Sequence, residues 1–227
     1  MRGTRTSQLA LATAFAVVTA FAAAPASASI IADFTDSAWD AGTGLTSFTV
    51  GSVTAESQGG LLNFSQGYDG SDPCLPGLAC DQDGGGIGDD EVTYDVATVS
   101  SSEVFYVYFA SPQTVTQIDF LDLFAAPDGG QGPDELAQFN FYGAGGALLG
   151  GGTATGTDTG DTGWASWTGA FSGVTKMRFF ADGTIGVTSP PNTDFAVAAI
   201  RTPEPGILGL MGVGLLGLGF AAVRRRA

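Results

Sequence analysis

The sequence predicts an all-β protein, an antiparallel β-sandwich of the jelly-roll type, flanked by terminal segments outside the fold. Short stretches alternate apolar with polar residues, which is typical of strands with one buried face. Clusters of Gly, Asp, Ser and Pro separate these stretches. The body has no long segment with the roughly 3.6-residue repeat of an amphipathic helix, and it lacks the fixed period of a β-helix. These observations favour a sandwich.

The expected strands follow one another along the body. A jelly roll would bring the first, residues 30–34, beside the last, residues 194–200. The strand expected at residues 103–109 should end at Ser111-Pro112, because proline cannot donate a ladder hydrogen bond. Residues 150–163 are rich in glycine and poor in apolar side chains, which predicts a loop. The other expected strands are residues 45–50, 92–99, 103–109, 115–124, 137–142, 164–167 and 174–180.

The first 28 residues have the pattern of a secretory signal peptide. Arg2 and Arg5 give a basic start, and the stretch 9–24 is apolar. The Ala-Ser-Ala sequence that ends at Ala28 offers the small residues that signal peptidase reads. We expect export through the Sec route with cleavage after Ala28, so that the exported domain spans residues 29–202.

The C-terminal segment, residues 203–227, has three parts in a fixed order. Pro203-Glu204-Pro205 cannot belong to a helix, because each proline pushes the preceding residue out of the helical region. Residues 206–223 carry no charge and are near the lower limit of roughly 17–25 residues for a transmembrane helix. Arg224, Arg225 and Arg226 follow directly, which predicts a cytoplasmic C-terminus.

This ending resembles the PEP-CTERM sorting signal of Gram-negative bacteria. The resemblance makes Pro203, Glu204 and Pro205 the sorting motif, residues 206–223 its transmembrane helix and Arg224, Arg225 and Arg226 its basic tail. It implies that the inner membrane first holds the exported body and that a membrane-embedded exosortase then cuts near the motif. The implied destination is the cell surface or extracellular matrix, in association with exopolysaccharide and biofilm. A plain membrane anchor that is never cut is the alternative.

Part of the body also resembles a domain often found ahead of such signals. The similar segments are residues 86–92, 117–124 and 194–198. Because that domain has no clear activity, the resemblance supports architecture rather than chemistry.

The body is strongly acidic and the chain has no histidine. All of the 23 acidic residues except Glu204 lie within residues 29–203, where the basic residues are Lys176, Arg178 and Arg201. Such a negative field disfavours nucleic acid and anionic membrane surfaces as partners. Without histidine, Ser-His-Asp and Cys-His catalysis and imidazole-bound zinc or copper are excluded. A carboxylate pair for glycoside hydrolysis remains open.

The cysteines and the acidic glycine-rich segment after them are neighbours in sequence. Cys74 and Cys80 flank a Pro-Gly turn signal, and in an exported chain this spacing predicts a local disulfide.

Residues 81–91 are a candidate Ca²⁺ site, because glycines let backbone carbonyls and carboxylates converge on a hard cation. The alternative is a solvated loop. The preferred ligands are Asp83, Asp89, Asp90 and Glu91.

The three tryptophans are candidate platforms for sugar rings. Trp164 and Trp167 lie three residues apart, so on one strand they face opposite sides, and we expect at least one of them in the core. Trp39 is the third candidate.

These observations predict a non-enzymatic exported surface or matrix protein, processed by signal peptidase and exosortase. The first alternative is a carbohydrate-binding module, with or without Ca²⁺. The second is a glycan hydrolase that relies on carboxylates.

Overall fold

The computed structural model describes residues 28–68, 74–89, 91–93, 103–125, 134–157, 163–181 and 194–203. The expected signal peptide up to residue 27, the expected membrane helix 206–223 and the arginine tail lie outside these residues, as do Glu204 and Pro205. Within the described ranges, no helix has the length and apolar character needed to cross a membrane.

The described chain is almost entirely antiparallel β-sheet, which confirms the all-β prediction. Only two short 3-10 helices interrupt it, η1 (Ser37–Gly42) and η3 (Ala144–Gly146), within the residues the structure describes. Eight strands form the main sheet in the order β1-β10-β6-β9-β7-β8, with β3 also paired to β6 and β2 paired to β3, while β4 and β5 form a separate pair. The strands are β1 (Ser29–Asp33), β2 (Ser47–Val50), β3 (Val53–Gln58), β4 (Leu62–Asn63), β5 (Gly86–Ile87), β6 (Val104–Leu121), β7 (Leu136–Tyr142), β8 (Leu148–Thr155), β9 (Ala165–Phe180) and β10 (Ala196–Thr202).

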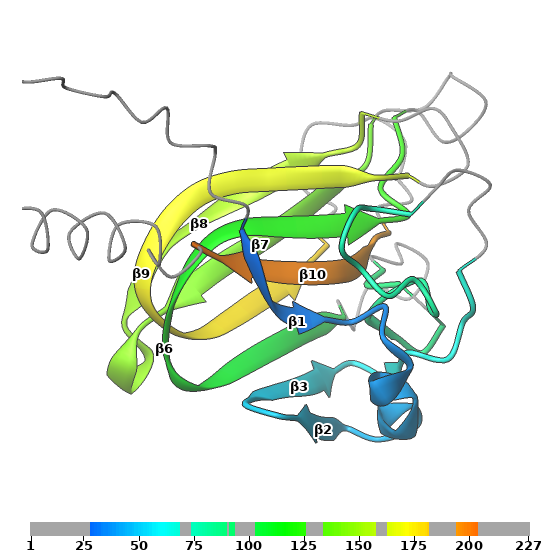
Figure 1. Ribbon diagram of the computed structural model, residues 1–227, viewed down its shortest axis with the longest axis horizontal. Helices are drawn as coiled ribbons and strands as arrows, with labels where there is room; N and C mark the ends of the chain where they lie inside the picture. Colours follow the sequence, from blue (N-terminus) through cyan, green and yellow to red (C-terminus); the bar gives the residue numbers. More distant parts are fainter. Residues whose placement is uncertain are drawn as a thin grey trace, which may run out of the picture.

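Two long bent strands, β6 and β9, fold this single sheet into two sandwich-like layers. The first part of β6, residues 104–109, pairs with β3 and with the end of β9. Its last part, residues 117–121, pairs with β10 and with the start of β9. Three register shifts lie between Tyr108 and Gln117. Figure 1 shows both strands curving round one side of the molecule, so each contributes to both layers.

The expectation that Ser111-Pro112 ends a strand is wrong, because β6 runs through it as one strand of 18 residues. Pro112 lies in the stretch between Tyr108 and Gln113 where the pairing with β9 shifts. Proline is tolerated at a bulge because no ladder donor is needed there. The two predicted segments 164–167 and 174–180 likewise belong to one strand, β9.

The predicted loop 150–163 is also partly wrong, because residues up to Thr155 belong to β8. Glycines are required here by the aromatic rings of the opposite strands. A Cβ on Gly150 would lie 2.4 Å from the Phe171 ring, and one on Gly152 would lie 2.8 Å from the Phe139 ring. Residues 158–162 lie outside the described ranges.

The core between the layers is built mainly from phenylalanines. Their rings contact one another at centroid distances such as 5.4 Å for Phe34 and Phe105 and 6.2 Å for Phe105 and Phe179. Burying each such side chain contributes about 1.5–3 kcal/mol. The fully buried phenylalanines are Phe34, Phe64, Phe105, Phe120, Phe139, Phe141, Phe179 and Phe195.

The tryptophans occupy three different environments. Trp39 of η1 is buried, with its ring 4.8 Å from that of Phe34. Trp167 packs against the core, 5.3 Å from the Phe139 ring, which confirms that one of the pair is a core residue. Trp164 remains 42% exposed. Of the three predicted sugar platforms, Trp164 is the most exposed to solvent.

Candidate functional site

The last strand carries the start of the C-terminal segment into the fold. Strand β10 pairs with β1 on one side and β6 on the other, with Ser29 opposite Thr202 and Ile30 opposite Arg201. This confirms that the first and last strands are neighbours, and Figure 1 shows them side by side. Pro203, the next residue, has no N–H to extend the ladder. The expected signal peptidase cut and the Pro-Glu-Pro motif therefore flank the same end of one ladder.

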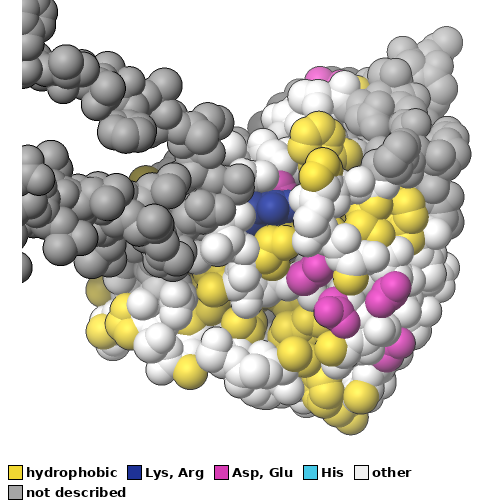
Figure 2. Space-filling model, viewed as in Figure 1, with side chains coloured by type: hydrophobic (Ala, Val, Ile, Leu, Met, Phe, Trp, Pro, Cys, Tyr) yellow, Lys and Arg dark blue, Asp and Glu magenta, His cyan; other side chains and the backbone are white. Residues whose placement is uncertain are grey.

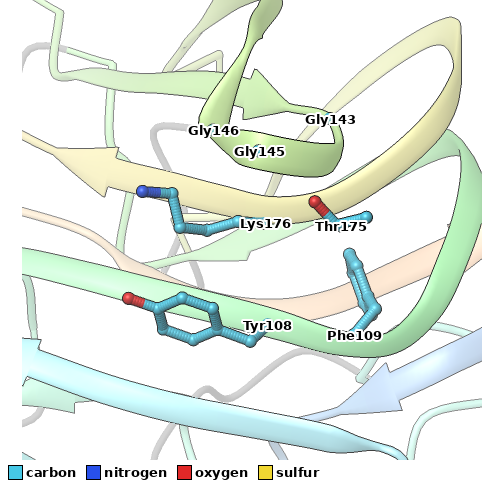
Figure 3. Close-up of a pocket in the computed structure, with 7 residues that line it drawn as sticks. All are labelled: Tyr108, Phe109, Gly143, Gly145, Gly146, Thr175 and Lys176. Carbon is cyan, nitrogen blue, oxygen red and sulfur yellow. The ribbon is translucent and has the colours of Figure 1, made fainter.

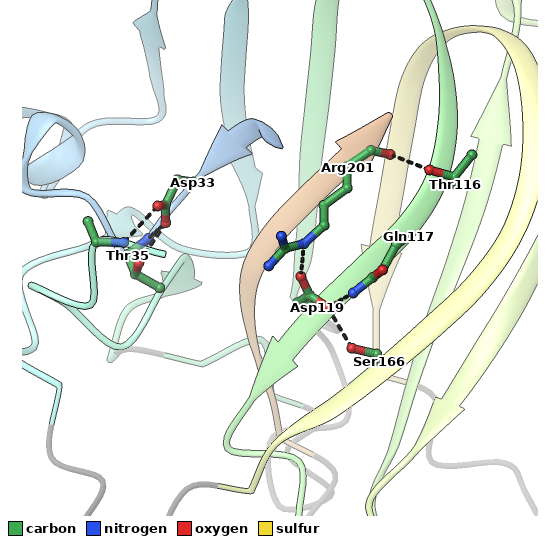
Figure 4. A network of polar contacts seen from close by, with 8 residues as sticks. Asp33, Thr35, Thr116, Gln117, Asp119, Ser166 and Arg201 are labelled. Carbon is green, nitrogen blue, oxygen red and sulfur yellow. Dashed lines mark hydrogen bonds and ion pairs between the residues drawn. The ribbon is translucent and has the colours of Figure 1, made fainter. Parts of the chain in front are cut away.

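A buried polar network fixes this end of β10. The Arg201 Nε donates to Asp119 Oδ2 at 2.5 Å, with side chains 12% and 1% exposed. The other Asp119 oxygen accepts from Ser166 Oγ at 2.5 Å and from Gln117 Nε2 at 2.6 Å. Figure 4 shows that three neighbouring strands, β6, β9 and β10, supply these groups. Because both oxygens of the buried carboxylate are bonded, its desolvation cost is offset.

The predicted disulfide between Cys74 and Cys80 is confirmed. Its loop is fastened to the end of β1, because Asp33 Oδ2 accepts from the Ala79 N–H at 2.9 Å and Thr35 Oγ1 accepts from the Cys80 N–H at 2.9 Å. The Asp33 side chain also bonds Thr35, as Figure 4 shows.

The same loop covers part of β10. Leu78 packs with Tyr68 against a small buried cluster that includes Ala196 and Ala198 of β10. The disulfide loop therefore lies beside the β1–β10 ladder and helps to cover β10.

The candidate Ca²⁺ ligands are placed in unlike environments. Asp83 is 4% exposed, whereas Asp89 is exposed, and Asp90 lies outside the described residues. Between them, Gly85 bonds Val197 of β10 and Ile87 is fully buried, so this part of the segment is packed into the body. Among the described residues, no group of three or more acidic or cysteine side chains is close enough to hold a metal ion.

One buried and one half-buried carboxyl group, Glu135 and Glu103, have raised pKa values. Burial, followed by a hydrogen bond to Asp194, raises the pKa of Glu135 well above its ordinary range. Burial also raises the pKa of Glu103 to about 7, although the Thr93 N–H that donates to it acts in the opposite direction.

The face of the sheet that carries Tyr106 and Tyr108 was not predicted from the sequence as a possible site. Tyr106 and Tyr108 alternate with the buried Phe105, Val107 and Phe109, and this alternation was the available signal. A pocket of about 310 Å³ is lined by Tyr108 and Phe109 of β6, by Thr175 and Lys176 of β9, and by glycines at and beside η3 (Figure 3). No local sequence pattern predicts that Arg201 pairs with Asp119, because 82 residues separate them along the chain.

Comparison with known proteins identifies the C-terminal segment. Residues 201–226 match the family model described as the PEP-CTERM protein-sorting motif. The chain thus carries a PEP-CTERM motif whose first residues are the last residues of β10. No curated protein and no solved structure matches this chain significantly.

Proposed function

We propose that this is an exported, non-enzymatic surface or matrix protein that an exosortase cuts at its C-terminal motif. In this proposal the signal peptide directs the body across the inner membrane, and residues 206–223 hold it there until it is cut. The protein is the substrate of the sorting reaction. The mature body then reaches the cell surface or the extracellular matrix, in contact with exopolysaccharide.

The observation that carries this proposal is the position of the motif relative to the fold. The matched region begins at Arg201, which β10 holds through its ladder and through Asp119. The fold ends at Thr202, and the Pro-Glu-Pro turn begins with the next residue. A cut at or after this turn removes no strand, so the released body keeps its whole core.

The position of the N-terminus supports the same proposal. Ser29, the expected first residue of the exported body, pairs with Thr202. Both expected membrane segments therefore join the body at one end of the β1–β10 ladder. Such a body can be held close to the membrane through either segment without unfolding a strand.

A non-enzymatic role for the body agrees with its side chains. The chain has no histidine, which removes the commonest general base, and its hydrogen-bonded carboxyl pair is Glu135 with Asp194. Both side chains are also less than a tenth exposed, which leaves little access for a glycan. A hydrolase would release sugar and lose that activity when Glu135 is changed to Gln.

The test is the intact mass of the protein isolated from its native host. We expect the wild type to lack residues 1–28 and the tail beyond the motif. Changing Pro203, Glu204 and Pro205 to Ala should leave the tail attached, because the exosortase no longer recognises it. Thr49→Ala, a change on the distant and exposed part of β2, is the matched control and should be processed as wild type. A full tail in both the wild type and the triple variant would leave a plain membrane anchor and overturn the proposal.

A further inference from the structure

Tyrosines and basic residues share one outer face of the sheet. We call the set Tyr106, Tyr108, Tyr142, Lys176 and Arg178 the sheet-face site. Strands β6, β9 and β7 place these side chains opposite the buried ones, since Phe105, Val107 and Met177 of the same strands point into the core. The five side chains are half-buried, as expected for groups that cover one another on an open sheet.

The strand register makes this set contiguous. Tyr108 lies opposite Lys176, which lies opposite Tyr142, and in the next row Tyr106 lies opposite Arg178. The Lys176 Nζ is 4.5 Å from the centroid of the Tyr142 ring, 5.4 Å from that of Tyr106 and 6.0 Å from that of Tyr108. One ammonium group is thus surrounded by three phenol rings.

The charges on this face contrast with the rest of the body. Lys176 and Arg178 are two of the three basic residues between residues 29 and 203. The third, Arg201, forms an ion pair with Asp119. Neither Lys176 nor Arg178 forms an ion pair with a carboxylate of the described residues; Arg178 instead lies over the Phe180 ring at 4.2 Å. In a body so rich in Asp and Glu, two adjacent cations without a carboxylate partner mark a place for an external anion.

There is open space beside Lys176. The pocket of about 310 Å³ is lined by Tyr108, Phe109, Thr175, Lys176 and the glycines at and beside η3. In that turn, Gly145 and Gly146 leave open space where a Cβ would stand. Figure 3 shows the Lys176 and Tyr108 side chains reaching in the same direction from neighbouring strands, below this turn.

An acidic residue lies at one edge of the sheet-face site. Glu56 of β3 lies opposite Tyr106, at the edge of the face. Burial first, and then the nearby Glu56 carboxylate, which also accepts a hydrogen bond from its hydroxyl, raise the pKa of Tyr108, so this phenol stays protonated. On the face shown in Figure 2, acidic side chains are more frequent than basic ones among the described residues. A densely charged polyanion such as nucleic acid would be repelled there.

We propose that the sheet-face site binds an acidic polysaccharide, a chain of sugar rings with spaced carboxylates. The tyrosine rings offer flat apolar surfaces for the C–H faces of the sugars. Their hydroxyls, and the side chain of Asn140 on β7 opposite Arg178, offer hydrogen bonds. Lys176 and Arg178 pair with the carboxylates. This proposal names the partner of the exported body and rests on the proposed export, because only an exported body meets such a polymer.

The test is a titration of the full chain, purified in detergent micelles, with polygalacturonate. Its methyl-esterified form is the matched ligand, because it keeps the sugar rings and removes the carboxylate charge. We expect binding to the acid form, at least tenfold weaker binding to the ester, and weakening as NaCl is raised. Equal binding of both forms, or none of the acid form, would overturn the proposal.

Variants locate the site. Lys176→Gln with Arg178→Gln should weaken binding at least tenfold, and Tyr108→Ala severalfold. Trp164→Ala is the matched control, because this exposed ring lies outside the site and is the other candidate platform. If Trp164→Ala abolishes binding while the double Gln variant keeps it, the site is wrong. Since processing is measured separately by intact mass, failure of binding and failure of sorting are distinguishable.

Discussion

At the scale of single residues, the position of Arg201 links the fold to the sorting motif. It is the first residue of the matched region and also part of the buried network around Asp119. The sequence alone identified the motif from its own residues. It did not identify the network, because Asp119, Ser166 and Arg201 meet only when three strands pair.

The first prediction concerns this ion pair. Arg201→Met should lower the free energy of unfolding by about 3–5 kcal/mol, because the Asp119 carboxylate stays buried without its cation. Arg201→Met combined with Asp119→Asn should recover most of this loss, because no charge remains buried. Urea unfolding of the exported protein measures both. Equal stability of the single variant and the wild type would show that the network contributes nothing.

The second prediction concerns the pH dependence of stability through Glu103. Its pKa is raised to about 7 in the folded state from an ordinary value of 4.5, mainly by burial. The folded state therefore keeps a proton that the unfolded state loses, so the contribution of Glu103 is complete below pH 4.5 and is lost as pH rises to about 7. Because Glu103 keeps partial access to water, screening reduces the loss to about 1–2 kcal/mol.

Glu103→Gln isolates this effect, because the amide oxygen still accepts from the Thr93 N–H but does not ionise in this range. The stability of the wild type should fall relative to this variant between pH 4.5 and 7, in urea unfolding at a series of pH values. Parallel curves for the two proteins would contradict the assignment.

At the scale of elements, alternation predicted most strands but misplaced their ends. The strands around 45–50, 137–142 and 194–200 were found with shifts of one or two residues. The continuity of β6 was missed because Ser111-Pro112 was expected to end a strand, and β9 was predicted as two separate segments, residues 164–167 and 174–180. Bulges in the pairing between these strands accommodate such residues, and bulges leave no local sequence pattern.

The glycines of β8 were read as a loop for a related reason. Glycine is required at these positions because the rings of Phe139, Phe171 and Trp167, on other strands, occupy the space where a Cβ would stand. Gly152→Ala should lower the free energy of unfolding by about 1–3 kcal/mol, because its Cβ would press on the Phe139 ring. Gly67→Ala, where no atom lies within 4 Å of the added Cβ, is the matched control and should change stability by less than about 0.5 kcal/mol. If both variants unfold at the same urea concentration, the packing argument fails.

At the scale of the whole molecule, the strand order places both expected processing points together. The all-β class and the neighbouring first and last strands could be predicted from the sequence, because alternation and strand count limit the architectures. The two layers sharing bent strands could not, since that depends on long-range register. The sheet-face site escaped prediction for the same reason: its members come from three strands and meet only across the ladder.

The sorting motif lies directly after a complete fold. This arrangement is tested by the identity of the last residue of the processed protein from the native host, read from the fragmentation spectrum of its C-terminal peptide. We expect this peptide to retain Thr202, so that β10 stays whole and Arg201 keeps its pairing with Asp119. A processed chain that ends before Ala196, and thus lacks β10, would contradict it.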